Sequence, residues 1–187
     1  MPSRCRFAAS LITVAGLALL AACRSPQSLP NASIPNTVDT VTLYALQGTP
    51  IGTPSAYALI GPEIVHTDQT ALFDFAFNID SQPIFLPSGT FSGLQRNSGL
   101  QKSNTPFNNI ITAPTEGYVI DQPLVISVGL VALMRSRSEV CSDGQSRPLY
   151  GKMRVLALDL SARTVQFEVL VDQNCGYLGL APGLPAQ

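Results

Sequence analysis

Histidine and tryptophan are nearly missing from this sequence, and their scarcity excludes several classes of function. The 187 residues include one His, no Trp and four Cys. The common zinc sites and most histidine-based acid–base schemes therefore lack their ligands or their proton carrier. A glycan-binding platform built on exposed aromatic rings is not supported either. We expect no metal, no cofactor and no catalytic residue, so a non-enzymatic role is favoured.

Charge of either sign is also scarce. Charged residues make up 12% of the chain, with eleven basic and twelve acidic side chains and a net charge of -1. No field of one sign is available to attract a polyanion, so we expect no nucleic-acid partner.

The N-terminus reads as an export signal. Arg4 and Arg6 precede the apolar run Phe7 to Leu20, which has 14 residues. A helix that spans a bilayer needs roughly 20 apolar residues, so this run suits a cleaved signal better than a permanent span.

Leu20-Ala21-Ala22-Cys23 resembles the lipobox of bacterial lipoproteins. The resemblance implies cleavage before Cys23, acylation of its thiol, palmitate among the acyl chains, and a membrane as partner through this N-terminal lipid. It places the protein in the cell envelope, and in a Gram-negative host the outer membrane is favoured because Arg24 stands where inner-membrane lipoproteins often carry Asp. The competing interpretation is an ordinary secretory signal with a coincidental cysteine.

Three regions are therefore expected: a signal peptide over 1–22, a lipidated Cys23 with a flexible tether over 23–37, and an all-β domain over 38–187. The tether has three prolines between positions 24 and 37 and no sustained apolar period. Extended, it would hold the domain roughly 40 Å from the bilayer.

The domain shows short alternating segments with no useful helical period. We expect a single antiparallel sandwich or small barrel of roughly eight to ten strands. Phe73 to Asp80 is predicted as a half-buried strand with Asp74, Asn78 and Asp80 on a solvated face. Segments 154–160 and 164–172 predict a hairpin, with Val165, Phe167, Val169 and Val171 on one buried face. The other candidate strands are 40–46, 55–60, 63–67, 84–86, 110–113 and 117–120.

Two further segments carry specific expectations. Leu124 to Met134 is apolar on both faces and predicts one central strand, with Gly129 as a possible bulge. Ser88 to Asn109 is rich in Gly, Ser and Asn and predicts a long loop.

Cys141 and Cys175 are the thiols left in the domain once Cys5 and Cys23 are assigned to the signal and the lipid. Two thiols exported to an oxidising compartment should pair, so we expect a structural disulfide between them. A catalytic cysteine is disfavoured because the single His66 is distant in sequence.

One concentration of positive charge could bind an anion or a protein partner. Five basic residues lie within twenty positions around Cys141, with Glu139 and Asp143 among them; they are Arg135, Arg137, Arg147, Lys152 and Arg154. Recognition by the segment 135–150 is one hypothesis, and a solvated loop of mixed charge is the simpler one.

Two further groups of polar residues have simpler roles than catalysis or metal binding. His66 and Asp68 could belong to a nucleophilic triad, but the sequence has no nucleophile motif beside them. Asp74, Asn78 and Asp80 offer oxygen ligands for calcium, yet along a strand the first and last are about 20 Å apart.

The segments 171–180 and 40–57 are similar to those of uncharacterised bacterial lipoproteins, a resemblance that carries no activity. We expect a lipid-anchored binding or accessory module of the cell envelope, which binds an envelope protein or a small ligand. The alternatives are a β-barrel that holds a small apolar ligand, and an envelope hydrolase.

Overall fold

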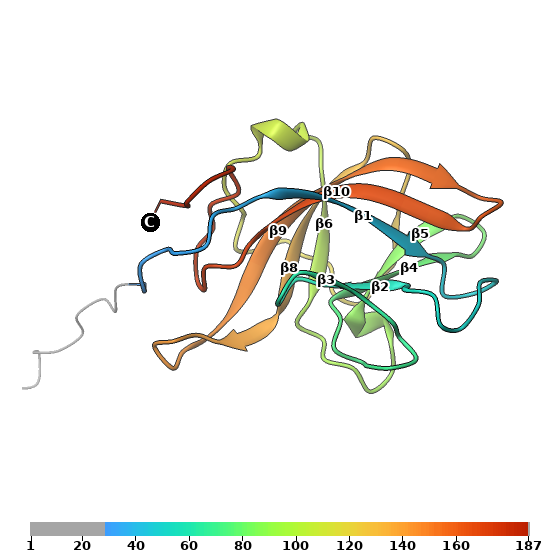
Figure 1. The fold of residues 1–187 in the computed structure, drawn as a ribbon, viewed down its shortest axis with the longest axis horizontal. Helices are drawn as coiled ribbons and strands as arrows, with labels where there is room; N and C mark the ends of the chain where they lie inside the picture. Colours follow the sequence, from blue (N-terminus) through green and yellow to red (C-terminus); the bar gives the residue numbers. More distant parts are fainter. Residues whose placement is uncertain (1–28, 187) are drawn as a thin grey trace, which may run out of the picture.

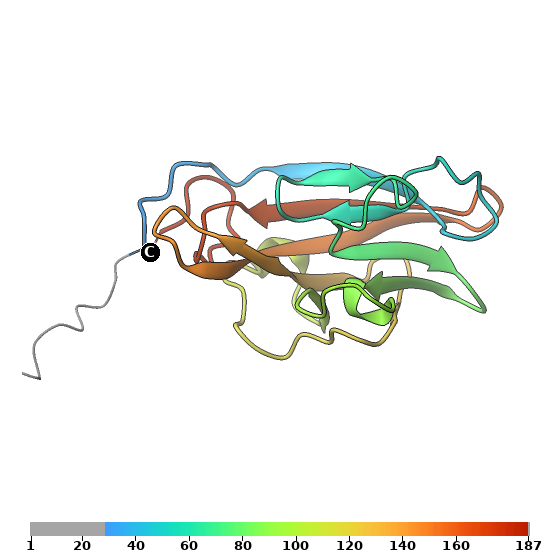
Figure 2. The same ribbon diagram turned by 90° about the horizontal axis from the view of Figure 1, so that it is seen from below.

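A computed structural model describes residues 29–186 as a sandwich of two antiparallel five-stranded sheets (Figures 1 and 2). The first sheet has the order β1-β10-β9-β8-β6 and the second the order β3-β2-β4-β5-β7. The all-β prediction is confirmed, and of its two architectures the sandwich is the one observed. The strands are β1 (Val38–Tyr44), β2 (Ala56–Ala58), β3 (Glu63–Val65), β4 (Phe75–Ile79), β5 (Pro83–Pro87), β6 (Gly99–Ser103), β7 (Leu124–Val125), β8 (Val131–Val140), β9 (Ser146–Asp159) and β10 (Thr164–Asp172).

Aromatic side chains fill the space between the two sheets. Phe75, Phe77 and Phe85 come from the second sheet and are fully buried. Phe167 reaches them from β10, with its ring centroid 5.6 Å from that of Phe85 in an edge-to-face arrangement. Such rings contribute packing beyond their buried area. The apolar-ligand alternative supposed a closed barrel, whereas the described residues form two separate sheets with aromatic rings packed between them.

The C-terminal hairpin was predicted correctly. β9 pairs with β10 in antiparallel register across a turn at 160–163. The predicted face of alternating residues, Val165, Phe167, Val169 and Val171, belongs to the core between the sheets. The opposite face is buried in part, because Leu170 joins a second apolar cluster on the outer side of this sheet, whereas Gln166 is exposed.

That outer cluster is covered by the segment between β6 and β7. The short helix η2 (Phe107–Asn109) lies over β9, where the buried Lys152 ammonium donates to the carbonyl oxygens of Phe107 and Ile110 at 3.0 and 2.9 Å. The same ammonium lies 4.6 Å from the centre of the Phe107 ring. Burial lowers the pKa of Lys152, and the charge of Glu168 opposes this shift. Lys152 therefore binds the loop at Phe107 to Ile110 to the outer face of the first sheet.

The segment Phe73 to Asp80 was predicted to have three solvated polar residues, and this prediction is wrong for two of them. Asp74 is 2% exposed and Asn78 7%, whereas Asp80 is exposed. Asn78 accepts a hydrogen bond from the amide of Gln47. The Asp74 carbonyl accepts from the amide of Ser88 in the helix η1 (Ser88–Thr90), and its carboxylate accepts from the amide of Arg137 in β8. Segments from elsewhere in the chain therefore bury Asp74 and Asn78, which the alternating pattern placed on the solvent side.

The predicted central strand over Leu124 to Met134 is two strands in different sheets. β7 pairs with β5 in the second sheet, and β8 pairs with β6 and β9 in the first. Gly129 has a φ of 86°, a left-handed conformation that glycine adopts without strain. It lies in the crossing between the sheets and forms no bulge.

The predicted loop over Ser88 to Asn109 contains an edge strand. β6 lies within it and pairs with β8. Conversely, the predicted strands over 110–113 and 117–120 are single bridges, Thr112 with Gly179 and Val119 with Leu100. The segment 135–150, for which a solvated loop was the simpler expectation, is also largely strand, because β8 and β9 continue to the turn that holds Cys141.

The expected signal peptide and Cys23 lie outside the described residues. Of the expected tether, positions 29–37 are described, and they are bonded to the fold. Asn36 forms an antiparallel bridge with Gly183, and its amide group donates to the carbonyl oxygen of Gly179 at 2.8 Å. The domain therefore begins several residues before Val38, and this part of the tether adds no reach.

Candidate functional site

The described chain begins at one end of the sandwich, and its C-terminus lies at that same end (Figures 1 and 2). The turn between β8 and β9 lies there too. We call this region the disulfide end and define it as residues 29–36, 141–147 and 174–186.

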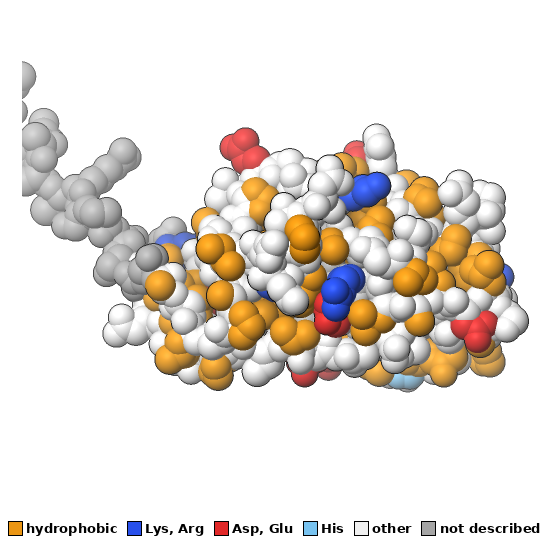
Figure 3. Space-filling model, turned by 90° about the horizontal axis from the view of Figure 1, so that it is seen from above, with side chains coloured by type: hydrophobic (Ala, Val, Ile, Leu, Met, Phe, Trp, Pro, Cys, Tyr) orange, Lys and Arg blue, Asp and Glu red, His pale blue; other side chains and the backbone are white. Residues whose placement is uncertain are grey.

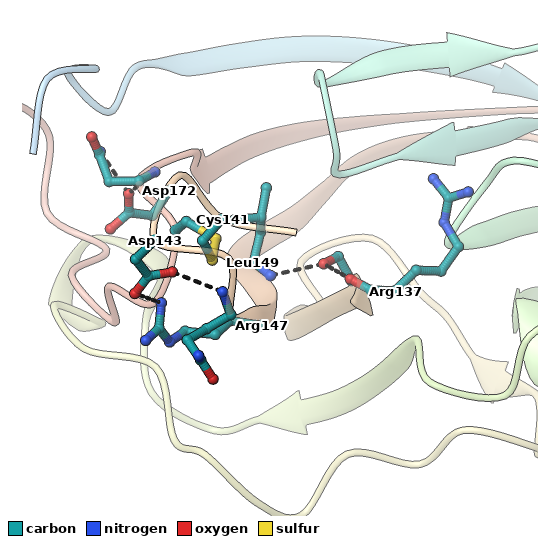
Figure 4. The surroundings of a disulfide bond; sticks show 10 residues. Arg137, Cys141, Asp143, Arg147, Leu149 and Asp172 are labelled. Atoms are coloured by element: carbon teal, nitrogen blue, oxygen red, sulfur yellow. Dashed lines mark hydrogen bonds and ion pairs between the residues drawn. A yellow bond between two sulfur atoms is a disulfide. The ribbon is translucent and has the colours of Figure 1, made fainter. Parts of the chain in front are cut away.

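The predicted disulfide is present at this end (Figure 4). Cys141 and Cys175 have Cα atoms 5.7 Å apart, within the usual range for a bridge. It joins the β8–β9 turn to the segment that follows β10. The Asp143 carboxylate accepts hydrogen bonds from the amide of Gln145 and from the Arg147 guanidinium, at 3.0 and 2.7 Å. The Gln145 bond, followed by the Arg147 bond, lowers the pKa of Asp143.

The residues on either side of Cys175 bind the first described residues of the chain. The Asn174 side chain accepts from the amides of Ser33 and Ile34, and its NH₂ group donates to the carbonyl oxygen of Ile34. The Tyr177 hydroxyl accepts from the amide of Ala32 and donates to the carbonyl oxygen of Pro30. Two side chains next to the disulfide thus bind four residues of the N-terminal segment through five hydrogen bonds.

A buried acidic group lies beneath these contacts. Asp172 is fully buried, and its Oδ1 accepts from the backbone and side-chain nitrogens of Asn174, both at 2.8 Å. Its Oδ2 has no hydrogen-bond partner, and neither has the buried Oδ1 of Asn36, whose side chain reaches this carboxyl. Burial raises the pKa of Asp172, and the hydrogen bonds from Asn174 oppose the shift.

Replacing Asp172 with Asn is expected to raise stability at pH 7. As the pH rises, the unfolded chain ionises at the ordinary carboxyl pKa, before the folded protein does, so ionisation of Asp172 weakens the fold above that pH and has no effect well below it. Asn keeps the Oδ1 acceptor for the two Asn174 nitrogens and cannot ionise. We expect a gain on the order of 1 kcal/mol at pH 7, or about 2–4 °C in Tm, that vanishes near pH 3.

Thermal unfolding of the Asp172→Asn variant at the two pH values measures this gain. Asp172→Ala is the matched control, because it also loses the bonds to Asn174 and should be less stable than the parent at both pH values. A loss of stability in Asp172→Asn at pH 7 would mean that the ionised carboxylate is what the fold requires.

An apolar groove of about 620 Å³ opens at the disulfide end. Its floor is a short ladder in which the amide of Ala113 donates to the carbonyl of Leu178, and the amide of Leu180 to that of Ile111. Pro185 closes one side so tightly that a Cβ on Gly179 would lie 2.7 Å from that of Pro185. The lining side chains are mostly apolar and include Leu29, Ile111, Leu178, Ala181, Leu184 and Pro185.

The five basic residues around Cys141 do not converge. Arg137 points away from the disulfide, toward the second sheet, whereas Arg147 folds back on Asp143 (Figure 4). Arg154 pairs with Glu168 at 2.6 Å, and the Arg135 guanidinium lies 5.3 Å from the centre of the Tyr118 ring. Lys152 is buried under η2, as described above. All five cations have partners within the fold, so the geometry does not assemble an anion site from them.

His66 makes a local contact, and the described residues assemble no metal site. The Nδ1 of His66 lies 2.8 Å from the carbonyl oxygen of Gly52, a contact between two surface loops. In residues 29–186, no group of three His, Cys, Asp or Glu side chains is placed to hold a metal ion. Within the same residues, no helix has the length and hydrophobicity needed to cross a membrane.

Sequence reasoning found the disulfide at this end but missed Asn36, Asn174 and Tyr177. The available signal was the polar run Asp172-Gln173-Asn174 directly before a cysteine, where side-chain amides commonly bind backbone. Compared with known proteins, the chain matches no family and no curated protein.

Proposed function

We propose that this chain is a lipid-anchored, non-enzymatic accessory module of the cell envelope, attached to the membrane through Cys23. One observation supports it above the others. The described chain begins at the disulfide end, at Leu29, the sixth residue after the lipobox cysteine. A lipid on Cys23 would therefore attach the domain by a defined end. A disulfide in a domain of this kind fits an exported, oxidising location.

The packing of the interior and the contacts of the polar side chains support binding at a surface more than catalysis. The space between the sheets is filled by aromatic rings, and the basic side chains around Cys141 have partners within the fold. No nucleophile is positioned beside His66 in the contacts of the described residues. In a Gram-negative host the outer membrane is the proposed location, with an envelope protein as the proposed partner.

Replacing Cys23 with Ser is expected to release the protein from membranes. Serine lacks the thiol that accepts the diacylglyceryl group, and two or three acyl chains make dissociation slow where one holds only marginally. Fractionation of cells that express both forms, with palmitate labelling, measures the change. Cys5→Ser is the matched control, because that residue lies in the expected signal and should leave the labelled protein in the membrane fraction. Continued sedimentation of Cys23→Ser with membranes contradicts the lipobox interpretation.

A further inference from the structure

The groove at the disulfide end exposes apolar side chains that are not needed in the core of the fold. Ile111 and Leu184 form its rim, and each is 64% exposed. Hydrophobic side chains are visible on the surface at the end where the described chain begins, and charged side chains on this face are few (Figure 3). Exposed apolar side chains gathered around one groove mark contact with a protein, a membrane or a ligand.

The position of Cys23 decides among these occupants. Leu29 lines the groove and packs on Gly176, where an added Cβ would lie 2.7 Å from a Leu29 methyl group. Six residues reach at most about 20 Å when extended, so a lipid on Cys23 keeps the groove within that distance of the bilayer surface. The intervening residues, Arg24 to Ser28, are polar apart from one proline and do not match an apolar groove.

We propose that this groove is a membrane-contact surface that lies against the headgroup–acyl boundary of the bilayer holding the Cys23 lipid. The proposal rests on the proposed lipid anchor. Ile111 and Leu184 insert into the boundary, where their side chains leave water. The neighbouring charges Asp143 and Arg147 neutralise each other at 2.7 Å, so the pair adds no net charge at this end. The domain is thereby oriented on the membrane rather than free to tumble on its anchor.

The absence of tryptophan allows a direct test. Leu184→Trp places the sole indole of the chain on the groove rim. Ile51→Trp is the matched control, because Ile51 is 85% exposed and follows β1, at the opposite end of the sandwich (Figure 1). Each lipidated variant is reconstituted into phosphatidylcholine vesicles with brominated or ordinary acyl chains. We expect a blue-shifted, about twofold quenched emission from position 184 and no quenching at position 51.

The outcomes separate this proposal from the lipid anchor itself. Vesicle-bound protein with equal, unquenched emission from both positions overturns the membrane contact, as does a blue shift that depends on protein concentration, which would indicate a second copy. Protein that does not float with the vesicles contradicts the anchor instead. Cys23 of the mature chain can then be coupled to a maleimide phospholipid, since Cys141 and Cys175 are bonded to each other, and the same comparison made. Ile111→Trp repeats the test if Leu184→Trp folds poorly.

Discussion

Asp74→Ala is expected to lower the free energy of unfolding by about 3–5 kcal/mol, the largest effect of any single substitution proposed for this domain. The carboxylate is 2% exposed and joins three distant segments. Its Oδ1 accepts from the Ser98 hydroxyl and from the backbone and Nε nitrogens of Arg137, at 2.9, 2.7 and 3.1 Å. Its Oδ2 accepts from the amide of Leu59 at 2.7 Å.

Removing this carboxylate leaves a buried guanidinium and two buried amides without acceptors. Each unsatisfied buried group costs about 1–3 kcal/mol, and a domain of this size has about 5–15 kcal/mol in total. Chemical denaturation of the purified variant measures the loss. Asp80→Ala, which removes an exposed carboxylate just after the same strand, should stay within about 0.5 kcal/mol of the parent.

A double replacement distinguishes the ion pair from simple loss of packing. Asp74→Leu with Arg137→Met removes both charges and keeps apolar volume, so it should recover part of the stability that Asp74→Ala loses, because no unpaired charge is left buried. Equal loss in the single and double variants would show that the cost comes from the amides of Leu59 and Arg137 rather than from the guanidinium.

Removal of the disulfide, by Cys141→Ser with Cys175→Ser, is expected to lower the free energy of unfolding by about 3–4 kcal/mol. The bridge closes a loop between residues 34 positions apart, which restricts the unfolded chain. It also holds Asn174 and Tyr177 where they bind the N-terminal segment. Protease cleavage within residues 30–34 should therefore increase as the stability falls.

Denaturation with and without a reducing agent measures this effect. Reduction should bring the parent protein to the midpoint of the double-serine variant, whereas the variant itself, which has no bridge to lose, should not respond. If the parent keeps its midpoint after full reduction, the bridge contributes nothing to the stability of the fold.

Alternation along the chain predicted those parts of the fold in which neighbouring strands are also neighbours in sequence. The hairpin of β9 and β10 and the inward face of Val165 and Phe167 follow from local pattern alone. The disulfide followed from counting thiols. These features depend on short-range pattern or on composition, and both are visible in one sequence.

Burial by distant segments was not predictable in the same way. Asp74 looks solvated from local alternation, and it is buried because Leu59, Ser98 and Arg137, from distant parts of the chain, all bond to its carboxylate. The segment Leu124 to Met134 forms two strands because the chain crosses between the sheets at Gly129. A continuous apolar run looks the same in sequence whether it forms one strand or two. The pairing of the five basic residues around Cys141 could not be predicted either. Their partners, such as Glu168 and the loop carbonyls over Lys152, lie elsewhere in the chain.

The first described residues bind to the last ones, so these contacts form late in folding. β1 pairs with a single strand, β10, and the amide of Ala32 bonds to a hydroxyl 145 positions further along the chain. During synthesis this N-terminal segment is the first part of the domain to emerge and among the last to find its partners. Contacts of such long separation slow folding. The sandwich therefore stays open at one edge until the C-terminal residues of β10 arrive.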